Sequence, residues 1–177
     1  SVLFGDVNPS GKLPITFYRD AAGMPAITDY SMKNRTYRYL ESEPLYPFGY
    51  GLSYTQFHYS DAVANHDGTG WSVSVTIKNI GRVRGEEVVQ VYLKDLESRY
   101  AVRNHALCAF GRVCLEPGEK KRITLPIREK AFEIVDEQGK RRLDSHCFRA
   151  FIGGSQPDPR SCSLMGTAPL ELTITRE

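Results

Sequence analysis

The heptapeptide NRTYRYL at residues 34–40 gathers the densest binding chemistry in this chain, because guanidinium groups alternate with phenol rings. The side chains concerned are Arg35, Tyr37, Arg38 and Tyr39. Such an alternation can bind nucleic acid, stack on sugar rings, or pack guanidinium groups on aromatic faces between protein domains. The motif occurs once, and 23 basic residues stand against 21 acidic ones, for a net charge of +2. We therefore expect no nucleic-acid partner, and packing is favoured over sugar contact.

Cysteine and histidine are the other residue types that could carry chemistry, with four of each in the chain. No CxxC pair and no metal-site spacing occurs among Cys108, Cys114, Cys147, Cys162, His58, His66, His105 and His146. Cys108 and Cys114 fall on one predicted strand, about 20 Å apart, whereas a disulfide needs Cα atoms within about 7 Å. We expect free thiols, no metal and no cofactor.

Acidic residues occur close together at three places: Glu41 with Glu43, Glu86 with Glu87, and Asp136 with Glu137. All three lie beside predicted turns among other polar residues, so we interpret them as surface charges. No GxSxG, phosphate-binding loop or HExxH motif is present.

No apolar run approaches the roughly 18 residues of a membrane span, and the first residues lack the basic start and apolar stretch of a signal peptide. Together with free cysteines, this favours a cytoplasmic protein without membrane contact.

From Trp71 onward the hydrophobic pattern has a period of two, as in WSVSVTIKN, where Trp71, Val73, Val75 and Ile77 share one face. Similar short runs follow about every ten residues, separated by turn signals such as EPGE, and no helical pattern appears. The strands predicted in this way are 71–79, 86–95, 107–115, 121–127, 131–136, 147–154 and 171–177. This arrangement predicts an all-β fold, an antiparallel β-sandwich of about seven strands.

Residues 1–60 differ, because beyond a short strand predicted at KLPITF (12–17) they show no sustained period. They include YPFGYGLSY (46–54), an uncharged segment broken by glycine and proline. Aromatic rings are strongly favoured in buried positions, and this segment cannot close a core by itself. We therefore expect an irregular arm that packs on another domain through Tyr46, Phe48, Tyr50, Tyr54 and Phe57.

The order of several motifs resembles the carboxyl-side portion of family 3 glycoside hydrolases of the β-glucosidase and β-xylosidase type. These motifs are GDVNPSGKLPITF, DYSMKNRTYRYL, PLYPFGYGLSYTQF, VTIKNIGRVRGEEVVQVYL, LEPGE and FIGGSQ. The resemblance implies that residues 1–20 are the last strand region of an α/β sandwich domain and 21–60 a connecting arm. Residues 61–177 would then form an immunoglobulin/fibronectin type III-like domain. The basic GKRR at residues 139–142 and the DSH at 144–146 depart from the family pattern.

By this resemblance the catalytic Asp and Glu belong to other domains, and neither of their motifs appears here, so no catalytic residue is assigned and the chain alone should be inactive. Its partners would be the missing catalytic domains and, in the complete enzyme, a β-linked oligosaccharide. Arg35 and Tyr37 are candidates for the rim of the sugar site. Two further expectations stay open: a role as a carbohydrate-binding or attachment module, and a homodimer of the isolated chain formed through residues 1–60.

Overall fold

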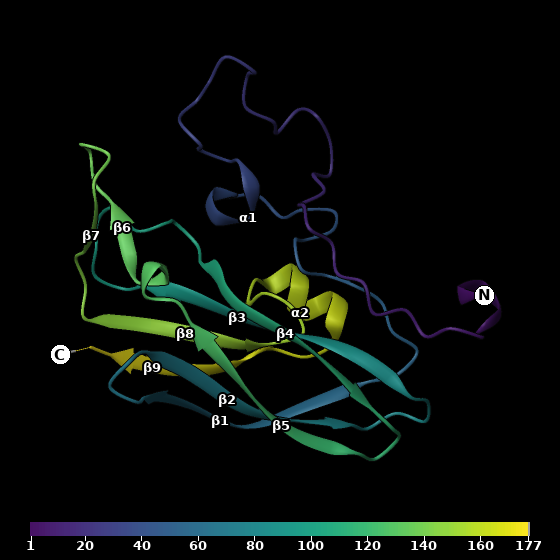
Figure 1. The fold of residues 1–177 in the computed structure, drawn as a ribbon. Coiled ribbons are helices and arrows are strands. Elements are labelled where there is room, and N and C mark those ends of the chain that lie inside the picture. Colours follow the sequence, from purple (N-terminus) through teal and green to yellow (C-terminus); the bar gives the residue numbers. More distant parts are fainter. Residues whose placement is uncertain (177) are drawn as a thin grey trace.

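A computed structural model describes residues 1–176 of the 177-residue chain. Within that range the chain forms two layers of antiparallel strands, with the arm lying outside one of them (Figure 1). The strands are β1 (Phe57–His66), β2 (Trp71–Asn79), β3 (Gly85–Asp95), β4 (Ala106–Leu115), β5 (Lys120–Ile127), β6 (Glu133–Val135), β7 (Arg141–Leu143), β8 (Cys147–Gly153) and β9 (Leu170–Thr175). The helical segments are short: η1 (Val2–Phe4), α1 (Thr36–Tyr39), η2 (Glu129–Ala131) and α2 (Pro159–Met165).

Seven strands build the sandwich and two form a separate hairpin. One sheet has the order β1-β2-β5 and the other β4-β3-β8-β9, while β6 pairs with β7. The all-β sandwich of about seven antiparallel strands is therefore confirmed. In the first sheet, β1 and β2 are consecutive in sequence and pair directly. Strand β5 also pairs with β2, although β3 and β4, which lie in the other sheet, separate the two in sequence.

The core lies between the two sheets and is built from the inward residues of the period-two pattern. Val73, Val75 and Ile77 of β2 are fully buried, as are Val89 and Val91 of β3. They share one hydrophobic cluster with Phe132, Phe148, Ile152 and Ile174. Alternate residues of these strands therefore face the core, as the period of two in the sequence predicts.

Strand β1 is missing from the sequence prediction, and the reason is a bulge. Pairing with β2 shifts register between Ser60 and Val63, and Asp61 has a φ of +53°. Phe57 and Tyr59 pack on the core before the bulge and Ala62 and Ala64 after it. The extra residue breaks the period of two, so alternation cannot be read across the segment. The first strand of the sandwich, β1, consequently begins at Phe57.

Helix α2 is also absent from the prediction, although its ends carry ordinary signals. Asp158 accepts a hydrogen bond from the Ser161 backbone N–H at 2.9 Å, and Pro159 occupies the first turn. Gly166 ends the helix with a left-handed φ of +67°. An N-cap, an early proline and a terminal glycine are sufficient to predict a short helix.

The arm, residues 1–56, has little regular structure, as expected. The strand predicted at 12–17 is reduced to an isolated bridge between Phe17 and Tyr46. Backbone hydrogen bonds join its two ends, Leu13 and Phe17, to residues 45–50. The arm follows the outside of the β4-β3-β8-β9 sheet, and its loop around residues 20–35 projects away from the sandwich (Figure 1). No helix within residues 1–176 is long and apolar enough to cross a membrane.

Candidate interdomain surface

Tyr37 lies inside the junction between the arm and the sandwich. Its ring stacks on Phe48, with centroids 4.3 Å apart and planes at 11°, and it meets Tyr92 of β3 edge-on at 6.1 Å. Its hydroxyl accepts a hydrogen bond from the Leu107 backbone N–H at 2.9 Å. The short helix α1 thus uses Tyr37 to anchor the arm on the outer face of the β4-β3-β8-β9 sheet.

Arg35 serves a different purpose from Tyr37, and the structure does not bring the two side chains together. Its guanidinium donates to the backbone carbonyls of Ala26, at 2.9 Å, and Asp29, at 2.7 Å. These contacts close the neck of the projecting loop. The rim assignment of Arg35 and Tyr37 stays a prediction.

The aromatic segment 46–54 is packed on the chain only in part. Tyr46 and Tyr50 stack with centroids 5.9 Å apart, yet Tyr46 remains 42% exposed. Tyr54 is 53% exposed and donates its hydroxyl to the Val2 carbonyl at 2.8 Å. Phe48 is half-buried, while Phe57 belongs to β1 and packs on the core of the sandwich. Their assignment to interdomain packing stays a prediction, with exposed area available mainly at Tyr46 and Tyr54.

Gly49 shows how closely the arm approaches the sheet. It has a φ of +79°, and a Cβ at this position would lie 2.4 Å from the Gln90 side-chain oxygen and 2.5 Å from the Tyr92 hydroxyl. Its carbonyl accepts a hydrogen bond from Gln90 Nε2 at 3.0 Å. Only glycine satisfies both the left-handed backbone and this close approach.

A buried ion pair ties the arm to β3. Lys12 Nζ lies 3.4 Å from Glu87 Oε1, with side chains 12% and 4% exposed. The Tyr59 hydroxyl of β1 donates to the same carboxylate oxygen at 2.8 Å. Burial raises the pKa of Glu87, while Lys12 and the Tyr59 hydroxyl act against this rise. Sequence reasoning placed Glu87 on the surface; the structure shows that it lies inside the junction, because Lys12 neutralises it there.

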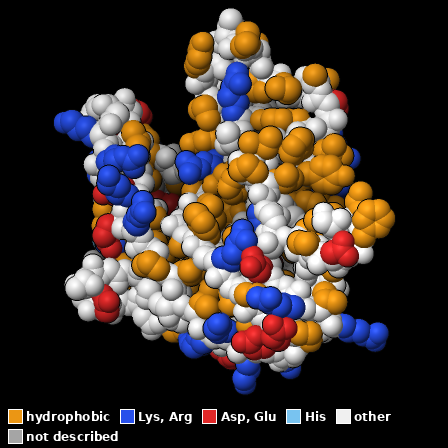
Figure 2. Space-filling view, turned by 45° about the vertical axis from the view of Figure 1, so that its right-hand side comes forward, with side chains coloured by type: hydrophobic (Ala, Val, Ile, Leu, Met, Phe, Trp, Pro, Cys, Tyr) orange, Lys and Arg blue, Asp and Glu red, His pale blue; other side chains and the backbone are white. Residues whose placement is uncertain are grey.

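The outward side of the arm carries many large hydrophobic side chains that the chain itself leaves uncovered. Figure 2 shows hydrophobic side chains gathered on one face of the molecule. The exposed arm residues are Val2, Leu3, Phe4, Val7, Ile15, Phe17, Met24, Ile27, Tyr30, Met32, Leu45, Tyr46, Leu52 and Tyr54. We call this set the arm surface. An apolar surface of this extent is typical of a protein–protein contact.

Phe110 adds a sandwich residue that sequence reasoning missed. It lies on β4, paired with Gln90, and is 68% exposed. Arg112, two residues further on, donates to Ser10 of the arm at 3.4 Å, so this strand borders the arm. An aromatic residue on the outward parity of a predicted strand was the signal available. A sheet that binds sugars would need several exposed aromatic side chains in a row. Among the described strands β1–β9, Phe110 is the single exposed large aromatic residue, so the strands do not form such a row.

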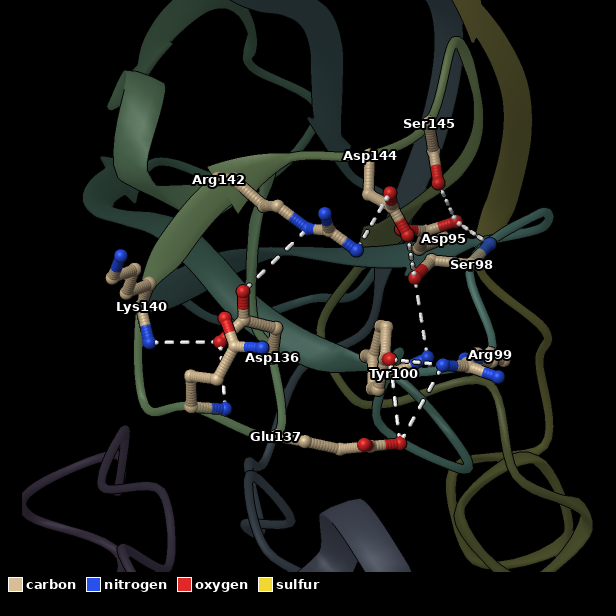
Figure 3. Close-up of polar contacts among 11 residues, drawn as sticks. Asp95, Ser98, Arg99, Tyr100, Asp136, Glu137, Lys140, Arg142, Asp144 and Ser145 are labelled. Atoms are coloured by element: carbon tan, nitrogen blue, oxygen red, sulfur yellow. Dashed lines mark hydrogen bonds and ion pairs between the residues drawn. The ribbon is translucent and has the colours of Figure 1, made fainter.

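Apart from Glu87, the acidic residues that occur close together in the sequence contact arginine side chains. Figure 3 shows Asp136 and Glu137 in a polar cluster that joins the β6-β7 hairpin to residues 95–100. Arg142 lies 3.9 Å from Asp136, and Arg99 lies 3.5 Å from Glu137.

Three further acidic residues behave in the same way. Glu41 contacts Arg103 at 3.3 Å, Glu43 contacts Arg19, and Glu86 contacts Arg112 at 2.6 Å. These are partly exposed ion pairs, each worth little stability.

The four cysteines are free, and Cys108 and Cys114 lie on one strand, β4, as the sequence predicts. Burial raises the pKa of the Cys108 thiol to about 12, so this group is not a reactive thiolate at neutral pH. Within residues 1–176 no group of His, Cys, Asp and Glu side chains is arranged to hold a metal ion.

Comparison with known proteins places both regions. Residues 1–54 match the glycosyl hydrolase family 3 C-terminal domain, and residues 87–156 match the fibronectin type III-like domain. The chain is 39% identical over 170 residues to a putative beta-xylosidase from Formosa agariphila, covering 92% of this chain and 22% of the relative. It is 38% identical to thermostable beta-glucosidase B from Acetivibrio thermocellus, covering 89% of this chain and 23% of the relative.

Solved structures agree with this placement. Beta-glucosidase 3B from Thermotoga neapolitana, 32% identical, superposes with a TM-score of 0.80 over 98% of this chain and 25% of its own. The chain thus spans less than a quarter of the length of the two curated relatives. It belongs to the carboxyl-terminal portion of the family 3 glycoside hydrolases and consists mainly of their fibronectin type III-like domain.

Proposed function

We propose that this chain is the non-catalytic part of a family 3 β-glycosidase, an enzyme that hydrolyses β-linked glucosides or xylosides. Its role is to stabilise the catalytic domains by covering them with the arm surface, while the sandwich holds the arm in place. The single observation that carries this proposal is the exposed apolar surface on residues 1–54, the segment that matches the family 3 C-terminal domain.

The contacts within the arm support the same role. The Arg35 clamp and the Lys12–Glu87 pair fix the arm to itself and to the sandwich, yet Ile27 and Tyr30 are each 89% exposed. A fixed backbone that presents apolar side chains loses little entropy when it meets a partner. The arm is therefore prepared for binding to a second protein body.

A chimera tests the proposal. Residues 1–177 replace the matching region of thermostable beta-glucosidase B, and hydrolysis of an aryl β-glucoside and thermal inactivation are measured. We expect an active chimera, background turnover by the chain alone, and faster inactivation with Ile27→Asp. Val135→Asp, on the distant β6-β7 hairpin, is the matched control and should have no effect. Turnover by the chain alone, or equal effects of the two substitutions, contradicts the proposal.

Three expectations remain as parts of this proposal. The loop closed by Arg35 would border the sugar site of the complete enzyme. The isolated chain would form homodimers through the arm surface, which sedimentation velocity with Ile27→Asp as the disrupting variant tests. The free thiols support a reducing compartment such as the cytoplasm.

A further inference from the structure

A cavity of about 520 Å³ lies where the arm, the sandwich and the start of α2 meet. Its walls come from arm residues 40–44, from the outward side chains Lys94 and Arg149 of β3 and β8, and from residues 156–160. In Figure 1, α1 and α2 both lie on the β3-β8 side of the molecule. Neither the core nor the arm surface uses this cavity. Its volume is within the range of small-molecule sites.

The floor of the cavity is a buried pair, His105 and Gln156, which are 7% and 3% exposed. His105 Nε2 lies 2.7 Å from Gln156 Oε1. Burial lowers the pKa of His105, so the ring is neutral at pH 7 and donates its single proton to the amide oxygen. That contact fixes the amide, and no residue within 1–176 accepts a hydrogen bond from its nitrogen. The floor therefore presents an unused donor.

A second polar group of the cavity also lacks a partner. The Thr16 hydroxyl belongs to the wall, is inaccessible to solvent, and has no hydrogen-bond partner among residues 1–176. Buried polar atoms are nearly always hydrogen-bonded, so the Thr16 hydroxyl is an exception at the cavity wall. The Gln156 amide nitrogen differs from it, because it is not one of the solvent-inaccessible atoms without a partner and can meet a ligand in the cavity.

The charges around the cavity are nearly balanced. Lys94, Arg149 and Arg160 stand against Glu41, Glu43, Asp158 and Glu171. Arg149 and Glu171 lie 3.9 Å apart across neighbouring strands, and Asp158 is occupied as the N-cap of α2. Paired side chains of this kind offer donors and acceptors without a strong field of either sign. An anion or a cation would be repelled by half of the wall, whereas a ligand rich in hydroxyl groups can use both halves.

We propose that this cavity binds a neutral saccharide of one or two sugar units. The ring of Phe151 and the imidazole of His105 belong to the cavity wall, and the Gln156 amide and the Arg149–Glu171 pair provide directed hydrogen bonds. The cavity is closed by the arm rather than spread along a sheet, so it recognises a short sugar and not a polymer surface. This inference stands independently of the proposed function, because all its groups belong to this chain.

Side-chain amide resonances in ¹⁵N-labelled chain 1–177 test the inference directly. Glucose, xylose, cellobiose and xylobiose are titrated, with glucuronate and glucosamine as charged controls. We expect saturable shifts of the Gln156 and Asn104 amide signals, both groups of the cavity wall. The expected Kd is on the order of 1 mM, typical of a ligand held by a few hydrogen bonds. Unmoved amide signals for all four neutral sugars, or a stronger response to a charged control, overturn the inference.

Two variants define which groups bind. Gln156→Glu keeps the oxygen that contacts His105 and removes the donor, and Arg149→Ala removes one half of the exposed pair. Each should raise Kd about tenfold, the loss of one hydrogen bond involving a charged or buried group. Arg122→Ala, on β5 of the other sheet, is the matched control and should leave Kd unchanged. Equal Kd values in all three variants would also overturn the inference, and none of these outcomes depends on glycosidase activity.

Discussion

The arm and the sandwich differ in how far they bury their hydrophobic side chains. In the sandwich, inward residues such as Val73 and Val91 are fully buried against the facing sheet. In the arm, Leu3 and Phe4 are 92% and 86% exposed, although backbone and side-chain hydrogen bonds hold the segment in one shape. The comparison shows that the sandwich buries its apolar side chains between its own sheets, whereas the arm is ordered by polar contacts and leaves many of its apolar side chains exposed.

The first way to test this difference is to remove a core ring. Phe148 is buried at 1% exposure and meets Phe132 edge-on at 5.1 Å. Phe148→Ala should lower the free energy of unfolding by about 3–5 kcal/mol in urea denaturation. Leu3→Ala, the matched change in the arm, should alter it by less than about 0.5 kcal/mol. Similar losses for both would mean that the arm is part of one core with the sandwich.

The second test concerns the connection between the two regions. Lys12→Met leaves the Glu87 carboxylate buried without its cation, which should destabilise the chain by about 3 kcal/mol. The double variant Lys12→Met with Glu87→Gln should recover most of this loss, since no charge remains uncompensated. Urea denaturation of the single and double variants measures the coupling. A double variant as unstable as the single one would show that packing of the lysine stem, and not charge, holds the arm.

The sequence reveals the sandwich better than the arm, for a physical reason. Strand β2 can be predicted because apolar and polar residues alternate without interruption from Trp71 to Lys78. Strand β1 cannot, because the bulge at Asp61 interrupts this alternation. The partnership of Lys12 with Glu87 joins residues 75 positions apart, and no local pattern encodes it. The aromatic arm could be expected to pack on something, but which rings turn inward depends on contacts such as Tyr37 on Phe48, which only the folded chain defines.

A third prediction uses pH to probe the junction at His105. Burial lowers the pKa of His105 below its ordinary value of 6.5, and the charge of Lys94 lowers it further. The Gln156 hydrogen bond and the charge of Asp158 oppose this shift, but their effect is smaller than that of burial. The titratable side chains of Tyr37 and Tyr92 also face the ring. Below about pH 6.5, His105 therefore binds a proton more readily in the unfolded chain than in the folded chain. The free energy of unfolding consequently decreases as the pH falls.

Chemical denaturation between pH 7.5 and 5 measures this slope. His105→Gln should make the decline shallower, whereas His58→Gln, at an exposed site on β1, should leave it unchanged. An identical slope in wild type and His105→Gln would show that the junction is open to water at this point.

The smallest effect is expected from the clamp of the projecting loop. Arg35 donates to the carbonyls of Ala26 and Asp29 at an exposed site, so Arg35→Ala should change global stability by less than about 1 kcal/mol. Local opening should nevertheless increase, because these bonds close the loop that carries Ile27 and Tyr30. Limited chymotrypsin digestion should cleave the variant faster after Tyr30, while Lys33→Ala, on the same loop, should digest like wild type. Unchanged cleavage in Arg35→Ala would mean that the loop keeps its shape without the clamp, and that its exposed apolar side chains are not presented on a prepared backbone.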